Sequence, residues 1–248
     1  MIKKIHYVWL GGKPLPSSVQ SSIRSWKKYC PDWDIIRWDE TNFPIGKYKW
    51  VREAVAVKKY AFAADFIRLW ALSCYGGGYC DTDVTFLRPI EESITSGFVC
   101  GIENHWMGTD NLNYMSTDGI DMRTGKPMNG FGMQTGFLYS EPNHPFVQYC
   151  IDKIYKNGQR PFIRDDGSYS LIVIDGALIW ALKDFKFLFK DETQKLIPNI
   201  LIYDSSVYAS RKTRNKNSYL IHWFDQTWSN KKGIKERIKK CKQSKKGY

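Results

Sequence analysis

The order of short apolar segments and longer amphipathic ones in the first hundred residues restricts this chain to few folds. Residues 3–12, KKIHYVWLGG, predict a strand that ends in a Gly-Gly turn, and residues 34–40 predict a second strand. Residues 17–33 predict a helix that stops before Pro31, and residues 52–78 one long helical stretch closed by glycines. Strands are expected again at 83–89 and 98–103. This order predicts an α/β fold with a mainly parallel central sheet.

The rest of the chain predicts more elements around a long polar loop. Residues 105–133 show no clear period, and loops of that length in a compact domain are usually functional or disordered. Further strands are expected at 135–140, 199–208 and 218–224, and helices at 144–158 and within 170–185. We expect one domain over residues 1–230 and a basic tail over residues 231–248.

The positive charge is concentrated in that tail. The chain has a net charge of +12, and residues 231–248 hold nine Lys or Arg against one Glu, which leaves only about +4 for the rest. A mildly basic body is not the footprint of a nucleic-acid-binding surface, so no nucleic-acid partner is expected. Ile234, Ile238 and Cys241 recur at helical spacing among the lysines. The tail is therefore either a basic amphipathic helix on an anionic membrane or a solvated segment.

The cysteines and the apolar segments indicate a cytoplasmic protein. The six cysteines form no C-x-x-C pair and no Cys/His zinc spacing, which favours reduced thiols. The apolar stretch at the N-terminus is too short for a signal peptide, and no apolar run is long enough to span a bilayer. If the tail binds lipid, we expect the protein at the inner face of the membrane.

Two aspartates follow three glycines in YGGGYCDTDVTFLRP, residues 75–89. In an extended segment Asp81 and Asp83 point to the same side, and two such carboxylates repel each other unless a positive charge lies between them. A hard divalent cation prefers carboxylate oxygens, so Mn²⁺ or Mg²⁺ is expected there, holding a nucleotide diphosphate. The bare D-x-D pattern also fits a solvated turn.

Asp65 and Arg68 lie three residues apart on the preceding helix and so share one face. Such a pair is often a simple surface ion pair. The surrounding helix is largely apolar, however, which indicates a buried pair close to the D-x-D segment.

These segments together resemble one known family. AADFIRLWALSCYGGGYCDTDV, residues 63–84, is similar to the signature of glycosyltransferase family 32 and its relatives, S/A-D-x-x-R followed by G-G-x-Y-x-D-x-D. These relatives include capsular polysaccharide enzymes, initiating mannosyltransferases and glucosylating clostridial toxins. The opening KKIHYVWLGG also resembles the family, and GFLYSEPNHPF and HWFDQTW do so more weakly. The resemblance implies a GT-A (Rossmann-like) nucleotide-sugar-binding fold and sugar transfer with retention of the anomeric configuration.

Carried over by position, the resemblance implies roles in donor binding for the first strand and the helix. Trp9, next to Val8 at the strand end, would stack on the donor base. Asp65 and Arg68 would hold the ribose and the sugar or phosphates.

The resemblance also implies the ligands of the metal. Asp81 and Asp83 would bind metal and donor, with Asp83 the more direct ligand. His222 is either a third metal ligand or a packed core histidine. It begins a segment similar to the family's late H-x(4)-S-W, in which Thr227 stands where the family usually has Ser. Thr227 and Trp228 would cover the diphosphate.

Two further segments bear on the sugar side of the site. Gln134, in MQTGFLYS, is expected near the reacting face of the sugar. Asp175 stands where many relatives have a T-G-P element, so the resemblance gives it no role. The sequence leaves open whether retention uses a carboxylate nucleophile or a same-face route.

The predicted function is transfer of a hexose from a nucleotide diphosphate sugar to a glycan or lipid-linked glycan. A UDP-sugar is the first expectation for the donor and GDP-mannose the alternative. The expected metal is Mn²⁺ or Mg²⁺, and the expected setting is bacterial capsule or surface polysaccharide biosynthesis.

Two other functions compete with this one. Residues 81–87, DTDVTFL, also fit the D-x-D-x-T motif of aspartate-nucleophile phosphatases, with Asp81 as nucleophile, Asp83 as acid/base and Asp165–Asp166 as a later acidic pair. That motif needs an apolar strand just before it, whereas glycines stand there, and it leaves Trp9 without a role. The tail alone would also fit a non-catalytic basic binding module.

Overall fold

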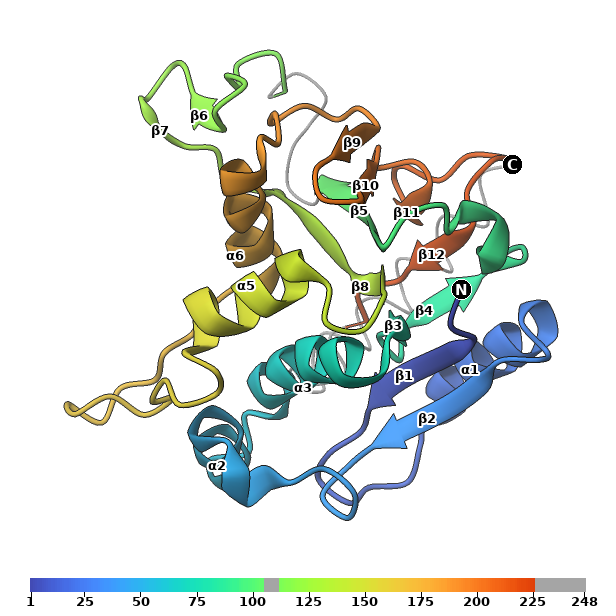
Figure 1. The fold of residues 1–248 in the computed structure, drawn as a ribbon, viewed down its shortest axis with the longest axis vertical. Helices are drawn as coiled ribbons and strands as arrows, with labels where there is room; N and C mark the ends of the chain where they lie inside the picture. Colours follow the sequence, from blue (N-terminus) through green and yellow to red (C-terminus); the bar gives the residue numbers. More distant parts are fainter. Residues whose placement is uncertain (105–111, 226–248) are drawn as a thin grey trace, which may run out of the picture.

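The central sheet has seven strands, in the order β2-β1-β3-β8-β5-β10-β9 (Figure 1). A computed structural model describes residues 1–104 and 112–225. β8 and β9 are antiparallel to their neighbours, and the other five strands run in one direction. The predicted α/β fold with a mainly parallel sheet is therefore confirmed. The strands are β1 (Lys4–Val8), β2 (Asp34–Trp38), β3 (Gly77–Cys80), β5 (Phe98–Asn104), β8 (Phe131–Ser140), β9 (Gln194–Leu196) and β10 (Ile200–Tyr203).

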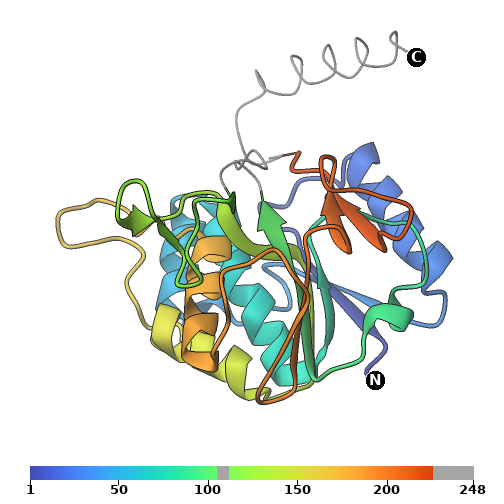
Figure 2. The same ribbon diagram turned by 90° about the horizontal axis from the view of Figure 1, so that it is seen from above.

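Each face of this sheet is covered by a different layer (Figure 2). One face packs against the four helices α2 (Lys49–Ala56), α3 (Tyr60–Tyr75), α5 (Pro145–Tyr155) and α6 (Ile174–Ala181). The other packs against α1 (Ser17–Tyr29) and a small sheet in the order β11 (Tyr208–Ser210), β12 (Leu220–His222), β4 (Val84–Phe86). Two apolar cores result, one on each side of the sheet. In the part of the chain that the structure describes, no helix is long and apolar enough to cross a membrane.

Three predicted elements differ from the structure. The strand predicted at 199–208 is divided between β10 in the central sheet and β11 in the small sheet. The single helical stretch over 52–78 is two helices, because Lys58 has a left-handed backbone (φ 57°) and the Lys59 amide donates to the Ala54 carbonyl, which ends α2. No Gly or Asn marks this end in the sequence. The described part of the predicted loop contains the hairpin β6 (Ile120–Asp121) and β7 (Lys126–Pro127) and the start of β8. Three 3₁₀ turns, η1 (Ile45–Lys47), η2 (Ile90–Ser93) and η3 (Leu182–Phe185), complete these elements.

The turn between α3 and β3 places the D-x-D segment. Gly76 ends α3 with φ 62°, and a Cβ there would lie 2.6 Å from Ile2 and 2.8 Å from Pro142, so only glycine fits. Gly77 and Gly78 begin a strand instead of ending the helix, because Gly77–Cys80 form the buried strand β3 between β1 and β8. Asp81 therefore follows a central strand at the same sheet edge as Trp9, as expected from the parallel order.

Candidate active site

Arg68 joins the helix to the D-x-D segment. Its side chain is only 4% exposed, and its Nη2 lies 3.1 Å from Oδ1 of Asp65 and 3.0 Å from Oδ1 of Asp81. Its Nη1 donates to the carbonyl of Thr135 at 3.0 Å, and its guanidinium lies over the ring of Tyr79. The predicted pair of Asp65 and Arg68 is thus a buried bridge to Asp81 rather than a surface ion pair.

Asp81, Asp83 and His222 converge on one point. Each offers a ligand atom, and these three atoms lie within 4.8 Å of one another. Asp81 uses Oδ1 for Arg68 and for the Tyr79 hydroxyl, so Oδ2 is the atom nearer to His222, 3.9 Å from Nε2. Asp83 uses Oδ2 for the Asp225 amide, and its Oδ1 lies 3.2 Å from the same Nε2. Two carboxylates and an imidazole fit a divalent cation such as Mn²⁺ or Mg²⁺.

The charges of this cluster depend on one another. Burial alone would lower the pKa of His222, but the charge of Asp83 and their hydrogen bond, together with Glu103 and Asp81, raise it to about 9. Burial acts to raise the pKa of Asp83, and the His222 imidazolium brings it below its usual value. Without a metal ion, the positive charge that the two neighbouring carboxylates need is supplied by His222 on one side and Arg68 on the other, and a cation that binds Nε2 would displace the proton of His222.

The pKa of Asp65 is raised, whereas that of Asp83 is lowered. Burial raises the pKa of Asp65 to about 7, Arg68 opposes the rise, and the carboxylates of Asp81 and Asp175 add to it. The Asp65 carboxyl group can therefore take a proton near neutral pH. Asp175, which the resemblance left without a role, lies at the start of α6 close enough for its charge to act on Asp65.

His222 is held in place by the small sheet and by a glycine of the central sheet. β12 pairs with β4, so that His222 lies opposite Val84, next to Asp83. A Cβ on Gly136 would lie 2.8 Å from Nδ1 of His222, and only a glycine in β8 leaves room for the imidazole. Among the described residues Nδ1 has no hydrogen-bond partner.

The residues after His222 are fixed to Asp83. The Trp223 amide donates to the Asp83 carbonyl at 3.0 Å, and the Asp225 amide to Asp83 Oδ2 at 2.7 Å. Phe224, between them, has φ 55°, a left-handed conformation that is rare for a bulky residue and is found mostly at functional sites. Its ring lies 3.7 Å from the imidazole of His222, centroid to centroid.

Two further predicted donor residues, Val8 and Trp9, lie at the same edge, on the β1 side. Trp9 is half-buried, and its Nε1 donates to the Lys13 carbonyl at 2.6 Å. The side chain of Val8 is buried in the core. Thr227, Trp228 and the basic tail lie outside the described residues. Their predicted roles, like those of Val8 and Trp9, stay predictions.

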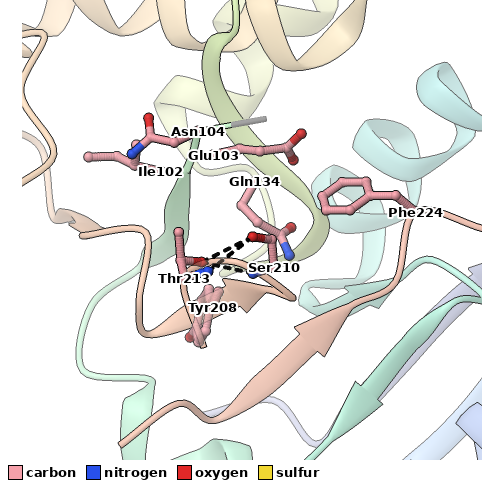
Figure 3. A pocket seen from close by; sticks show the side chains of 8 residues that line it. All are labelled: Ile102, Glu103, Asn104, Gln134, Tyr208, Ser210, Thr213 and Phe224. Atoms are coloured by element: carbon pink, nitrogen blue, oxygen red, sulfur yellow. Dashed lines mark hydrogen bonds between the residues drawn. The ribbon is translucent and has the colours of Figure 1, made fainter. Parts of the chain in front are cut away.

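Gln134 lies in β8, and residues that the sequence analysis missed lie beside it. Glu103 and Asn104, at the end of β5, and Phe224 line a pocket with Gln134 (Figure 3). The position of Glu103 at the carboxyl end of a predicted strand was the only signal in the sequence.

The acidic pair of the phosphatase alternative, Asp165–Asp166, lies in an exposed turn, where Asp166 accepts hydrogen bonds from Ser168. A strand, Gly77–Cys80, does precede Asp81, but two of its four residues are glycines rather than apolar residues. The site differs from that of the phosphatase alternative at Asp81, the supposed nucleophile. Its Oδ1 accepts hydrogen bonds from Arg68 and from the Tyr79 hydroxyl.

The comparisons with known proteins point to sugar transfer. Residues 16–100 match the family described as "Glycosyltransferase sugar-binding region containing DXD motif". A comparison with curated protein sequences gave no match.

Solved structures of glycosyltransferases are similar to the chain at low identity. The PaToxG glycosyltransferase is 16% identical over 74% of this chain and 69% of its own, with a TM-score of 0.47. A glycosyltransferase involved in the glycosylation of the major capsid of PBCV-1 is 11% identical over 95% and 98%, with a TM-score of 0.45. The galactosyltransferase LgtC, in complex with donor and acceptor sugar analogs, is 12% identical over 97% and 95%, with a TM-score of 0.43.

The match over residues 16–100 covers Asp65, Arg68, Asp81 and Asp83. It agrees with the resemblance in the sequence and favours sugar transfer over the phosphatase and the binding module. The D-x-D segment follows a central strand of an α/β sheet, as the resemblance implied. On this evidence the chain carries the D-x-D region of glycosyltransferases over residues 16–100, in an α/β fold with a mainly parallel sheet.

Proposed function

We propose that this enzyme transfers a hexose from a nucleotide diphosphate sugar to a glycan or lipid-linked glycan, with retention of the anomeric configuration. The donor that we propose first is a UDP-sugar, with GDP-mannose as the alternative. Bacterial capsule or surface polysaccharide synthesis is the proposed setting. The observation that carries this proposal is the convergence of Asp81 Oδ2, Asp83 Oδ1 and His222 Nε2 beside the buried Arg68.

These three residues are the proposed ligands of Mn²⁺ or Mg²⁺. When bound, the metal would supply the positive charge that a departing nucleoside diphosphate requires. Arg68 fixes the orientation of Asp81, since it holds one oxygen of that carboxylate at 3.0 Å and turns the other toward the cluster. The Asp225 amide does the same for Asp83. The site is thus pre-organised by contacts on the far side of each carboxylate.

The donor is proposed to lie along the sheet edge from β1 to β8. Trp9, with the main chain at Val8, would hold the base, and Asp65 and Arg68 the ribose and the sugar or phosphates. Gln134 would face the reacting side of the sugar. Thr227 and Trp228 complete the proposed donor site on the evidence of the sequence alone.

Thermal unfolding tests this function. UDP, UDP-glucose, UDP-galactose, UDP-GlcNAc, GDP and GDP-mannose are added separately, with Mn²⁺, with Mg²⁺ or with EDTA. One nucleotide and the corresponding nucleotide sugar are expected to raise the midpoint of thermal unfolding when metal is present, because a ligand of the folded state stabilises that state. Most of this increase is expected to be lost in EDTA. Stabilisation that is equal with and without EDTA contradicts the metal site. No stabilisation by any nucleotide contradicts the donor site.

A further inference from the structure

The loop between β11 and β12 carries the excess positive charge of the body of the protein. Residues 211–216, RKTRNK, contain four Lys or Arg and no acidic residue. The tail, residues 231–248, accounts for +8 of the net charge of +12 and this loop for the other +4, so the remaining residues together carry no net charge. One short loop of the folded domain therefore stands out as an attachment point for an anionic partner.

The start of this loop is folded back on Ser210 by hydrogen bonds of its backbone. Oγ of Ser210 accepts the amides of Lys212 at 3.2 Å and Thr213 at 3.3 Å, and the Ser210 carbonyl accepts the amide of Arg214 at 3.1 Å. Figure 3 shows the bonds between Ser210 and Thr213. The loop is thus a built turn, and its backbone needs no help from the charged side chains.

The charged side chains point to solvent instead. Lys212, Arg214 and Lys216 are exposed, and within the described residues their side chains form no ion pair and no hydrogen bond. The far end of the loop is fixed by Ser218, whose Oγ donates to the Ser206 carbonyl at 2.6 Å. Three cations are therefore presented together on a fixed support, available to an external partner.

The loop leaves the small sheet beside the metal-ligand cluster. Ser210 ends β11 and lies opposite His222 of β12 in the register of the two strands. The guanidinium of Arg211 lies 4.9 Å from the ring centroid of Trp223, which follows His222. Because the loop folds back on Ser210, its first cations stay at the sheet edge where the D-x-D segment lies.

The chain continues from this same edge into the basic tail. Asp225 is held there by the bond from its amide to Asp83, and residues 231–248 follow with nine Lys or Arg. Among these cations the sequence repeats the apolar residues Ile234, Ile238 and Cys241 at helical spacing. An anionic bilayer offers both charged headgroups and an apolar interior, whereas a soluble polyanion offers only the charge.

We infer that residues 211–216 dock the folded domain on an anionic bilayer, with the D-x-D edge of the central sheet facing the lipid. Each basic residue near such a surface strengthens binding on the order of fivefold. The tail has more cations and provides the anchor, while the loop sets the orientation, since stable membrane attachment commonly takes two signals. In this orientation the acceptor is a lipid-linked glycan, a step that rests on the proposed function.

The test measures how the full chain partitions onto phosphatidylcholine vesicles with and without phosphatidylserine. Sedimentation is done at about 0.1 M salt, where charges more than about 10 Å from the membrane are largely screened. A triple variant, Lys212→Gln with Arg214→Gln and Lys216→Gln, removes three side chains that make no described contact, so its unfolding midpoint should stay unchanged. Its partition onto the phosphatidylserine vesicles is expected to fall about 10- to 100-fold.

The control removes three exposed charges at the opposite edge of the sheet. It combines Lys27→Gln and Lys28→Gln, at the end of α1 before β2 starts, with Lys195→Gln in β9, next to the start of β10. Net charge falls by the same amount in both triple variants. Partition of the control is expected to change by less than about twofold, because screening separates that edge from the lipid.

Amide hydrogen exchange on the vesicles tests the orientation. Residues 211–217 are expected to exchange more slowly when phosphatidylserine vesicles are present. Residues 194–200, at the opposite edge of the sheet, are expected to exchange at the same rate with and without vesicles.

The outcomes separate this surface from the donor site. Equal partition of the two triple variants, no binding of the full chain to phosphatidylserine vesicles, or unchanged exchange in the loop overturns the docking surface. A loop variant that loses binding to soluble polyphosphate but not to vesicles also overturns it, because the partner is then a soluble polyanion. These results stand whether or not UDP and Mn²⁺ stabilise the protein, and failure of that stabilisation contradicts the donor site instead.

Discussion

Nε2 of His222 lies 3.2 Å from Oδ1 of Asp83, although one residue comes from a late strand and the other from the D-x-D segment. β12 pairs with β4 and so brings the histidine to the aspartate, and Gly136 leaves the space that its ring fills. The third ligand position of the proposed metal site therefore depends on how the small sheet lies on the central one.

Asp83→Asn is expected to abolish metal-dependent donor binding. The amide keeps the size of the side chain but removes the charge that a divalent ion requires. Metal affinity should fall more than about 100-fold, since even changes outside the ligand shell cost about 10- to 100-fold. Mn²⁺ titration in the presence of UDP measures this. Asp83 is only 16% exposed, not the exposed residue expected of a strand end, so circular dichroism must first show that the variant folds. A folded variant with wild-type Mn²⁺ affinity would refute the assignment.

Gly136→Ala is expected to weaken the metal site without removing a ligand. The added methyl would lie 2.8 Å from Nδ1 of His222 and force the imidazole away from Asp83. We expect Mn²⁺ affinity to fall about 10- to 100-fold, as for other changes that misplace a ligand. Gly176→Ala is the control, because its methyl meets no atom within 4 Å. Equal Mn²⁺ affinity in the two variants would show that His222 is not a ligand.

Arg68→Met is expected to destabilise the fold. It leaves Asp65 and Asp81 without their shared guanidinium, and removal of one partner of a buried ion pair costs about 3–5 kcal/mol. At about 2–4 °C for each kcal/mol, the midpoint of thermal unfolding should fall by roughly 6–20 °C. Arg52→Met is the control. Arg52 is exposed, and within the described residues its side chain donates a hydrogen bond to the Gly46 carbonyl alone. Similar midpoints for the two variants would contradict the bridging role.

Trp9→Ala is expected to weaken UDP and UDP-sugar to the same extent. Stacking of a base on an aromatic ring contributes about 1–3 kcal/mol, which corresponds to a loss of roughly 5- to 150-fold in affinity. Isothermal titration with both ligands measures it. Trp180→Ala, which removes another half-buried indole, from α6, is the control. A loss confined to the sugar-bearing ligand would place Trp9 elsewhere in the site.

Truncation after Ser229 is expected to abolish binding to anionic membranes. The tail holds nine Lys or Arg, and each basic residue near such a surface contributes on the order of 1 kcal/mol. The full chain should sediment with phosphatidylserine liposomes at low salt and be released as the salt concentration rises. Equal sedimentation with neutral and anionic liposomes, or none with either, contradicts the amphipathic interpretation and leaves the solvated one.

The sequence by itself determined the α/β class, the first strand and helix, and the D-x-D segment with Asp65 and Arg68. Apolar periodicity, glycines at turns and short spacings specify local structure, and all of these residues lie within a short stretch of chain. The break at Lys58 was missed because a lysine in the left-handed region leaves no mark in the sequence.

Only the tertiary structure decided the rest of the site. His222 is close to Asp83 because β12 pairs with β4, and Glu103 and Gln134 line the same pocket because β5 pairs with β8. These are contacts between segments far apart in the chain. The free energy that forms them comes from burial of two apolar cores, and no local pattern at either residue encodes which partner it will meet.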